Sequence, residues 1–423
     1  MTGLLGGGHA VYLEAAAGTV RNLDCFCAVP GLGSGPRRAA ELVEIQVPFG
    51  VELVHYAVGP ASCAVPGVPA GLGELWRAHG RLPWQRLFEP ALRLARDGVE
   101  MPPAHVACLE MLAPVMTMRE GARMYAPAGT LLRAGDRLEQ PGLVRALEAL
   151  AEEGAAGVYT GSIGESLLAL STERGGVLTR DDLVSYRARW TEPVERSRLG
   201  LCFQTRGGLS GVPSALERLP PLQALSPAER VLALVAVLDD GAAAAETHTT
   251  NLVVVDGAGN ACVLTTSLGL GSGDWLPGLD LHLNSMLGEV DLLRRPLEPG
   301  DRMESMMAPT LVLDDEGLVL AVGAAGGTRL RTALLTAAAG VLDEELEPQA
   351  AVDRPRVHPA RGVVHAEPGV EADALEALEA RGRTVRRWPE RHHYFGGVSA
   401  VGRRGTAADI RRSGAAVTLP PAG

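Results

Sequence analysis

The sequence predicts a layered α+β sandwich, in which helices flank antiparallel sheets. Helical patterns prevail between residues 70 and 186, whereas two strong strands follow one another at 250–256 and 260–267. The glycine-rich loop between these strands is short enough for a hairpin, so the two strands are expected to be antiparallel. Helices recur between the later strands, which favours helices packed against sheets.

The first half combines short strands with helices. Strands are expected at residues 11–14, 20–28 and 41–48, and a helical stretch runs from 70 to 95, interrupted by Gly80 and Pro83. Apolar residues recur at helical spacing over residues 143–153. The run Thr179-Arg180-Asp181-Asp182 is typical of a helix cap and first turn.

Composition changes between about residues 207 and 248. Several prolines punctuate this stretch, and it closes on Gly241 and four alanines, which predicts a mobile, cleavable linker. A half rich in strands follows. Its later strands are expected at 310–313, 318–322, 362–365 and 397–401, with helices at 328–341 and 371–381.

Composition excludes several classes of function. The chain has 423 residues, of which 46% are hydrophobic, enough for a substantial core. Its net charge of -11 argues against nucleic acid or an anionic membrane surface as partner. All 39 basic residues are arginine. The absence of lysine excludes a Schiff-base lysine, a Ser–Lys dyad and a phosphate-loop lysine.

The cysteines and histidines do not indicate a metal centre, and no cofactor is expected. Cys25 and Cys27 lack the paired spacing of a zinc site and are interpreted as core thiols on one face of a strand. Reduced thiols and the lack of a targeting segment favour a cytoplasmic location. His392 and His393 are adjacent, and adjacent side chains of a strand point apart, which argues against a shared metal.

The candidate chemistry lies where the linker meets the first strand of the second half. Asp256-Gly257-Ala258-Gly259-Asn260 fits a hairpin with a three-residue loop, with Gly259 free to adopt a positive φ. Counted back from this turn, Thr249 lies opposite Ser267 and Asn251 lies opposite Thr265. Two hydroxyl side chains are therefore expected to face each other where the sheet begins.

A threonine at such a position becomes a nucleophile when a base is adjacent. If the chain is cut before Thr249, the freed α-amine has a pKa of about 7.7–8.0 and can serve as that base. Thr-Thr at the start of a strand is common, however, so an ordinary structural role remains open. Similarly, the glycine-rich run from Val322 to Thr328 could offer backbone N–H groups to an oxyanion, or could be a plain strand–helix turn.

Both segments resemble the gamma-glutamyltransferase family of N-terminal-nucleophile hydrolases. The family's Thr-Thr-His, hydrophobic run and Val-Asp-x-x-Gly-Asn-Ala correspond to residues 249–261. The resemblance continues in order over most of the chain. Further matching segments are Gly67–Gly71, 95–98, 157–161, 175–183, 271–273, Leu283-Asn284, 305–310 and Gly326-Gly327-Thr328-Arg329.

The resemblance implies an αββα sandwich of four layers, made as a precursor that cuts itself between His248 and Thr249. Residues 1–248 would be a large-subunit-like segment and residues 249–423 a small-subunit-like segment, folded as one unit. Thr249 would attack the γ-amide of a γ-glutamyl substrate and pass the acyl group to water or an amine.

Individual site residues are carried over by position. Gly326 and Gly327 match the family's oxyanion-hole glycines, and Ser267 matches a hydroxyl residue that contacts the nucleophile. Glu289 falls where an aspartate holds the substrate's α-ammonium, and Ser305 falls where a serine binds its α-carboxylate. Asn284 is assigned to substrate binding through the same resemblance.

The glutamate pocket departs from the family pattern more than the reaction machinery does. Phe26 stands where the family has the arginine for the α-carboxylate, and a phenyl ring cannot replace a bidentate guanidinium. The loop near Gly269 is shorter by two residues and lacks an asparagine. Other substitutions are Met286 for glutamine, Met306 for serine and Asn251 for histidine.

Two segments also look shortened, and they leave a second interpretation open. A strand and helix expected before the N-terminal glycine turn are missing, so Met1 is questioned as the true start, and the helices between Cys202 and Thr249 look largely deleted. The alternative to an active enzyme is an uncleaved, catalytically silent relative or a truncated product with a structural or binding role.

Overall fold

The computed structural model describes residues 3–33, 42–49, 52–239 and 249–420. The chain divides into two compact units, and each contains residues from both sides of position 248. Unit 1 comprises Met1–Gly8, Asp24–Arg189 and Thr266–Glu304, and unit 2 comprises His9–Leu23, Trp190–Thr265 and Ser305–Gly423.

Unit 1 is mainly helical. Its core contains buried apolar side chains of α5 and α6 and the rings of Tyr159 and Tyr186, which stack with centroids 5.5 Å apart. Its elements are α1 (Val68–His79), α2 (Glu89–Asp97), α3 (Pro103–Met116), α4 (Glu120–Tyr125), α5 (Pro141–Glu153), α6 (Ser162–Glu173), α7 (Arg180–Ser185), and the hairpin of β3 (Val43–Phe49) and β4 (Glu52–Val58).

Helix α7 begins as the sequence predicts. The Thr179 hydroxyl accepts from the backbone N–H of Asp182 at 3.2 Å, and the Asp182 carboxylate accepts from the backbone N–H of Thr179 at 2.8 Å. This reciprocal capping satisfies two backbone donors that the first helical turn leaves open. The same carboxylate also accepts from the backbone N–H groups of Gly31 and Leu32, so it anchors a distant loop.

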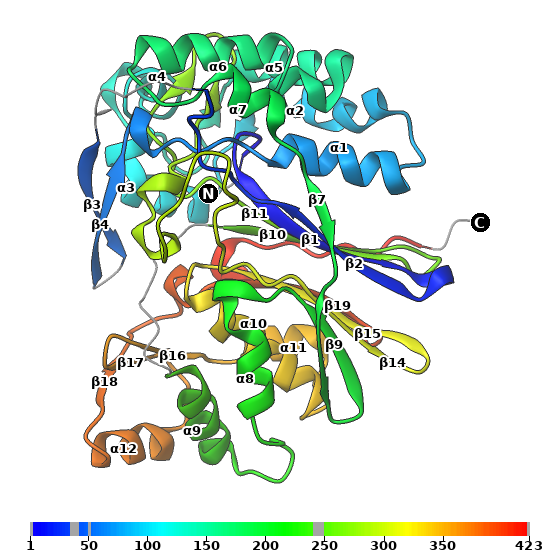
Figure 1. The fold of residues 1–423 in the computed structure, drawn as a ribbon. Helices are drawn as coiled ribbons and strands as arrows, with labels where there is room; N and C mark the ends of the chain where they lie inside the picture. Colours follow the sequence, from blue (N-terminus) through cyan, green and yellow to red (C-terminus); the bar gives the residue numbers. More distant parts are fainter. Residues whose placement is uncertain (1–2, 34–41, 50–51, 240–248, 421–423) are drawn as a thin grey trace. The chain divides into compact units, whose positions relative to one another are not determined.

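Unit 2 contains a six-stranded sheet in the order β20-β19-β15-β14-β9-β8, shown in Figure 1. Its neighbouring strands are all antiparallel. Buried side chains of four helices pack on the sheet in one large core. The strands are β8 (Val194–Arg198), β9 (Leu201–Thr205), β14 (Thr310–Asp314), β15 (Gly317–Ala325), β19 (Gly397–Gly402) and β20 (Gly405–Ala408), and the helices are α8 (Val212–Arg218), α9 (Pro227–Leu238), α10 (Arg329–Leu342) and α11 (Pro348–Asp353).

A second sheet packs on the other side of β14 and β15. It has the order β10-β11-β1-β2-β7, and most of its residues belong to unit 2. Val11, Val263, Leu311 and Ala321 are fully buried in the cluster between the two sheets. Unit 2 is therefore layered as helices, sheet and sheet. The strands are β1 (Gly7–Glu14), β2 (Thr19–Cys25), β7 (Arg189–Thr191), β10 (Thr250–Val255) and β11 (Ala261–Ser267).

The α+β class and its antiparallel sheets are confirmed, and the elements lie close to their predicted positions. Strands β14 and β15 pair directly, and α10 follows β15, as expected. A small sheet of β16 (Val357–Ala360), β17 (Val363–Ala366) and β18 (Thr384–Arg387) packs with α9 and α12 (Ala372–Ala380).

The predicted linker is wrong over much of its length. Residues 207–239 contain helices α8 and α9, and their apolar faces belong to the core of the six-stranded sheet. Helix α9 begins with a capping box between Ser226 and Glu229 and has Pro227 at its first position. The remaining part of the predicted linker, 240–248, lies outside the described residues.

Four charged side chains form a buried network near the C-terminal end of unit 2. The Arg411 guanidinium donates to both carboxylate oxygens of Glu367 at 2.6 Å, and Arg356 donates to Asp409 at 2.5 Å. Arg411 also reaches Asp409 at 3.2 Å. Burial lowers the pKa of Arg356 although Asp409 favours its charged form. Such a network is stable only when each charge keeps its partner.

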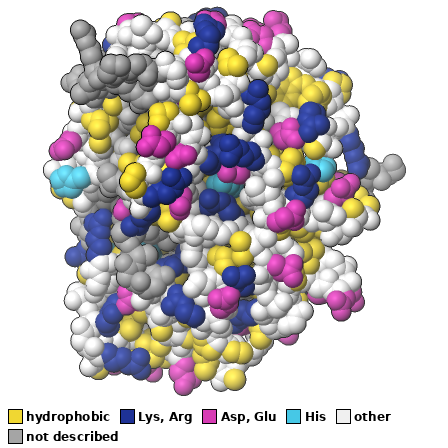
Figure 2. All heavy atoms as spheres, in the orientation of Figure 1, with side chains coloured by type: hydrophobic (Ala, Val, Ile, Leu, Met, Phe, Trp, Pro, Cys, Tyr) yellow, Lys and Arg dark blue, Asp and Glu magenta, His cyan; other side chains and the backbone are white. Residues whose placement is uncertain are grey.

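Charged side chains of both signs share the face that is drawn in the space-filling view (Figure 2). Figure 2 shows arginine and carboxylate side chains interspersed over the face in view. Within the described residues, no helix is both long and apolar enough to cross a membrane.

The helical character of the predicted linker gives a stability test. Leu216 of α8 is 4% exposed, so Leu216→Ala removes core contacts and should lower the free energy of unfolding by about 2–5 kcal/mol. Leu94 of α2 is 59% exposed and provides the matched control, because Leu94→Ala should change stability by at most about 0.5 kcal/mol. Urea denaturation of both variants measures the difference. Equal, small effects would restore the linker interpretation.

Candidate active site

The hairpin that carries the predicted nucleophile forms as expected. Asp256 donates its backbone N–H to the Asn260 carbonyl at 2.9 Å, and Gly259 has φ +84° in the loop. The Asp256 carboxylate accepts from the backbone N–H groups of Ala258 and Asn260, which fixes the turn. Thr249 immediately precedes β10 and is 6% exposed. His248, the other residue of the predicted cleavage site, lies outside the described residues.

The predicted strand register is confirmed at Asn251. Its side-chain oxygen accepts a hydrogen bond of 2.7 Å from the hydroxyl of Thr265 on β11. Asn251 also lies against Gly323 on β15, in the neighbouring sheet. Ser267, predicted to lie opposite Thr249, is two residues beyond Thr265 on β11 and belongs to unit 1.

The predicted oxyanion loop joins β15 to α10. Gly326 has φ +132° and Gly327 has φ +61°, conformations that favour glycine. In the described part of the chain, no hydrogen-bond acceptor contacts the backbone N–H of either glycine. These two donors lie just before the N-terminus of α10, where the helix dipole also favours negative charge.

Two arginine side chains donate hydrogen bonds to backbone carbonyls beside this loop. The fully buried Arg329 donates through Nε to the Tyr394 carbonyl at 3.0 Å, and Arg412 donates to the His393 carbonyl at 3.1 Å. A Cβ at Gly326 would lie 2.9 Å from Gly396 Cα, so the backbones approach too closely for a side chain. Burial lowers the pKa of the His393 imidazole to about 3, so this ring adds no charge beside the two arginines near pH 7.

Ser305 also belongs to unit 2, with Thr249 and the two glycines. It is 1% exposed, and its hydroxyl accepts from the backbone N–H of Met307 at 3.1 Å. The Arg206 guanidinium donates to the Ser305 carbonyl at 2.6 Å. Sequence analysis missed Arg206, because no motif marks it and its partner lies 99 residues away.

Unit 1 contains three predicted site residues, and two of them, Ser267 and Glu289, lie beside Gly269. Ser267 accepts from the backbone N–H of Gly269 at 2.9 Å, and the Ser285 hydroxyl accepts from the N–H of Leu270 at 3.1 Å. A Cβ at Gly269 would lie 2.6 Å from the Ser285 hydroxyl and 2.8 Å from the Glu289 carboxylate. Ser285 is therefore a member of this cluster that sequence analysis did not identify.

Asn284, the third residue, has a structural role. Its amide nitrogen donates to the carbonyls of Leu5 and Ala64 at 2.9 and 2.8 Å. Its oxygen accepts from the backbone N–H groups of Ala64 and Met286 at 2.9 and 3.2 Å. An amide with two donors and two acceptor sites is saturated by these four contacts. This pattern favours cross-linking of three loops over contact with a substrate.

Phe26 is buried in unit 1, at 1% exposure. Its carbonyl accepts from the Tyr186 hydroxyl at 2.6 Å and from Arg302 at 2.5 Å. Arg302 also donates to the Arg187 carbonyl at 2.6 Å and lies over the Tyr186 ring. The guanidinium next to Phe26 is thus engaged in internal contacts.

The predicted core thiols are confirmed, whereas the argument about the histidine pair is wrong. Cys25 and Cys27 are buried and free, and burial raises the pKa of Cys25 to about 12. His392 and His393 lie at the start of a 3-10 turn and not in a strand, and their ring centroids are 4.0 Å apart. Within the described residues, no group of His, Cys, Asp and Glu has the arrangement of a metal site.

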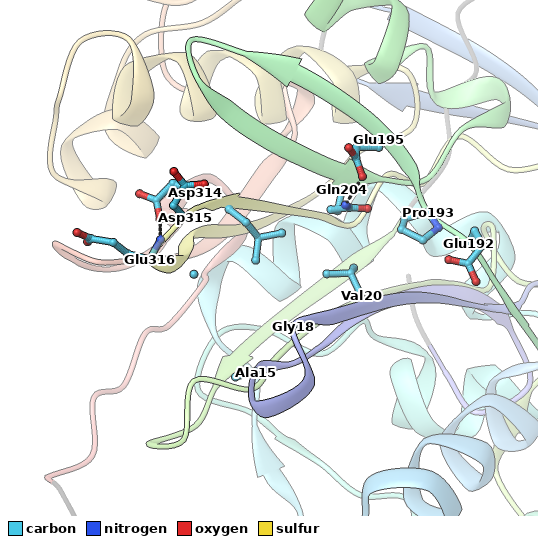
Figure 3. Close-up of a pocket in the computed structure, with 12 residues that line it drawn as sticks. Ala15, Gly18, Val20, Glu192, Pro193, Glu195, Gln204, Asp314, Asp315 and Glu316 are labelled. Atoms are coloured by element: carbon cyan, nitrogen blue, oxygen red, sulfur yellow. Dashed lines mark hydrogen bonds between the residues drawn. The ribbon is translucent and has the colours of Figure 1, made fainter.

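A separate pocket in unit 2 contains none of the predicted site residues. Figure 3 shows its polar lining at the β14–β15 turn, with a volume of about 530 Å³. Asp314 pairs with Arg403 at 2.5 Å, and Glu195 accepts from Gln204 at 2.8 Å. Its carboxylates are Glu192, Glu195, Asp314, Asp315 and Glu316.

The chain is similar to known proteins in sequence and in fold. The profile of the family described as gamma-glutamyltranspeptidase matches residues 1–211 and 221–419. The acylase ACY 1 proenzyme of Pseudomonas sp. (strain V22) is 25% identical over 95% of this chain and 82% of its own length. The glutathione hydrolase proenzyme of Pseudomonas aeruginosa is 26% identical over 86% of this chain and 79% of its own.

A solved structure shows the same fold. The cephalosporin acylase of Bacillus halodurans aligns with a TM-score of 0.82 at 20% identity, covering 100% of this chain and 90% of its own. The family match covers nearly the whole chain, including Thr249, Ser305 and the Gly326–Gly327 loop. The chain belongs to the gamma-glutamyltranspeptidase family.

Proposed function

We propose that this protein cleaves itself before Thr249 and then hydrolyses or transfers the acyl group of an amide through a threonyl ester. Family membership makes it an amide-hydrolysing or amide-transferring enzyme of the N-terminal-nucleophile type. The observation that carries the residue assignment is the contact, within unit 2, between β10, which follows Thr249, and β15 of the facing sheet, which leads into Gly326 and Gly327.

Self-cleavage would use the Thr249 hydroxyl and water. The hydroxyl oxygen attacks the carbonyl carbon of residue 248, the C–N bond breaks, and the acyl group moves from nitrogen to oxygen. Water then hydrolyses this ester, leaving a new carboxylate at residue 248 and a free α-amine on Thr249. That amine has a pKa near neutrality and can act as the base of the later reaction.

Turnover would repeat the same chemistry on an external amide. The α-amine takes the hydroxyl proton as the oxygen attacks the substrate carbonyl, and the Gly326 and Gly327 N–H groups stabilise the oxyanion. The leaving amine departs with the proton, leaving an ester on Thr249. Water or a second amine then attacks this ester and releases the acyl group. The precursor would supply both fragments of the active protein.

The acyl pocket is proposed to retain only part of a glutamate site. Glu289 in unit 1 supplies a carboxylate suited to an α-ammonium group. Phe26 supplies no charge for an α-carboxylate, and Arg302 is engaged elsewhere. Relatives of this chain include proteins named acylase as well as glutathione hydrolases, so the family serves more than one acyl group. A silent, uncleaved relative is not favoured, because the nucleophile and the oxyanion loop are both retained.

Self-cleavage is tested by the size of the purified protein. Wild-type protein should give two fragments, the smaller beginning at Thr249. Thr249→Ala should remain one chain because the nucleophilic oxygen is lost, whereas Thr249→Ser keeps a hydroxyl and should still cut. Denaturing electrophoresis with intact mass distinguishes these outcomes. A wild-type chain that stays whole under all conditions would support the silent relative.

The oxyanion loop is tested at Gly326. A valine there is incompatible with φ +132° and with the close approach of Gly396, so it displaces the backbone donors. Losing one such donor costs about 2.7–4 kcal/mol in the transition state, or about 10²–10³ in kcat. Gly257→Val is the matched control, because a Cβ at Gly257 meets no atom within 4 Å. Equal activity of the two variants would remove the loop from the mechanism.

Specificity is tested with paired donors. A hydrogen-bonded charge contributes about 1.5–3 kcal/mol, so its absence at Phe26 should remove about one to two decades of preference for a free α-carboxylate. We therefore expect a γ-glutamyl anilide and its α-amide analogue to have similar kcat/KM values. A strong preference for the free carboxylate would contradict the proposal and direct attention to Arg206 beside Ser305.

A further inference from the structure

Asn251 makes an unusual set of contacts between the two sheets of unit 2. Its side-chain oxygen is bound by the Thr265 hydroxyl at 2.7 Å, within its own sheet. On the other side it lies directly over Gly323 of β15: a Cβ at Gly323 would be 2.1 Å from the Asn251 side-chain oxygen and 2.7 Å from its nitrogen. The amide therefore fills the space that a side chain at position 323 would occupy.

A third strand completes the arrangement. Ser399 of β19 is the register partner of Gly323. The Ser399 hydroxyl donates to the backbone carbonyl oxygen of Asn251 at 3.4 Å. Asn251 thus contacts both neighbouring strands of the six-stranded sheet at one level. Its side-chain nitrogen is buried and has no partner in the described residues. A buried polar group is costly at such a site, which argues that packing alone does not account for this residue.

The place of these residues along their strands connects them to the reaction. Asn251 is two residues after Thr249, and residues two apart in a strand share a face. Gly323 is three residues before Gly326, on the strand that leads into the oxyanion loop. Through the Asn251 side chain, β10, which follows Thr249, therefore contacts β15, which leads into the Gly326–Gly327 loop.

We propose that Asn251 is a positioning residue, which sets Thr249 at the distance from the Gly326–Gly327 N–H groups that the reaction requires. The Thr265 hydroxyl holds the amide in one orientation, and the missing side chain at Gly323 lets it reach the oxyanion strand. The inference rests on the proposed function and adds to it a residue that touches neither substrate nor reacting atoms.

The proposal predicts a specific pattern of kinetics. Shifting a reacting group by about 1 Å can lower the rate by about 10²-fold, so Asn251→Ala should lower kcat by about 10–100-fold. KM should stay within about twofold, because the acyl pocket is unchanged. Gly323→Ala should have a similar effect, since its methyl group displaces the amide. In the Asn251→Ala background, Gly323→Ala should cost little more, because the space over position 323 is then empty.

The experiment is a double-mutant cycle on the full-length protein, with kcat, KM, the rate of self-cleavage and the melting temperature measured for all four forms. Val253→Ala, two residues further on the same strand face, is the control for loss of packing alone. Coupling in kcat with unchanged KM supports the proposal. Additive effects on kcat, or coupling that appears only in the melting temperature, would overturn it.

Different results would contradict the proposed function and the positioning role of Asn251. A wild-type protein that neither cuts itself nor turns over any amide contradicts the proposed function. An active wild type whose Asn251→Ala variant keeps full kcat contradicts only the positioning role. If Asn251→Ala does not fold, Thr265→Val gives the same test, because it removes the hydroxyl that orients the amide while preserving side-chain volume.

Discussion

The face-to-face packing of two sheets in unit 2 sets the geometry on which the candidate chemistry depends. One sheet carries Thr249 at the start of a strand, and the other ends in the two glycines of the oxyanion loop. Val263, Leu311 and Ala321 are fully buried between the sheets and hold them at a fixed spacing. Stacked sheets lie about 10 Å apart, and small changes in the side chains between them change that spacing. The apolar layer therefore sets the separation between Thr249 and the glycine loop, the two parts of the candidate site.

Features governed by local chemistry could be predicted from the sequence. The turn at Asp256–Asn260 follows from loop length and one glycine with positive φ, and it fixed the pairing of Asn251 with Thr265. The helix cap at Thr179 could likewise be predicted from the sequence. Residues 207–239 contain the prolines that predict a linker, but they also contain the capping box at Ser226, which marks the start of α9 in the sequence.

Features that depend on distant parts of the chain could not be predicted. Nothing near Asn284 shows that its amide joins the backbones of Leu5 and Ala64, and nothing near Arg206 shows that it contacts Ser305. Glu289 and Ser267 were assigned to the site through the family resemblance, and both lie beside Gly269, but the part of Ser285 in that cluster appeared only in three dimensions.

The buried charges of unit 2 also bear on when the protein can mature. Arg356 is fully buried with Asp409, and Glu367 with Arg411. In each pair, the second residue is synthesised more than forty residues after the first. An unpartnered charge at such a site costs about 3–5 kcal/mol, enough to keep the region open. The two ion pairs of unit 2 can therefore form only after Asp409 and Arg411 have been synthesised. We therefore expect the proposed cut at Thr249, which needs the closed sheets, to occur in the completed polypeptide and not in the nascent chain.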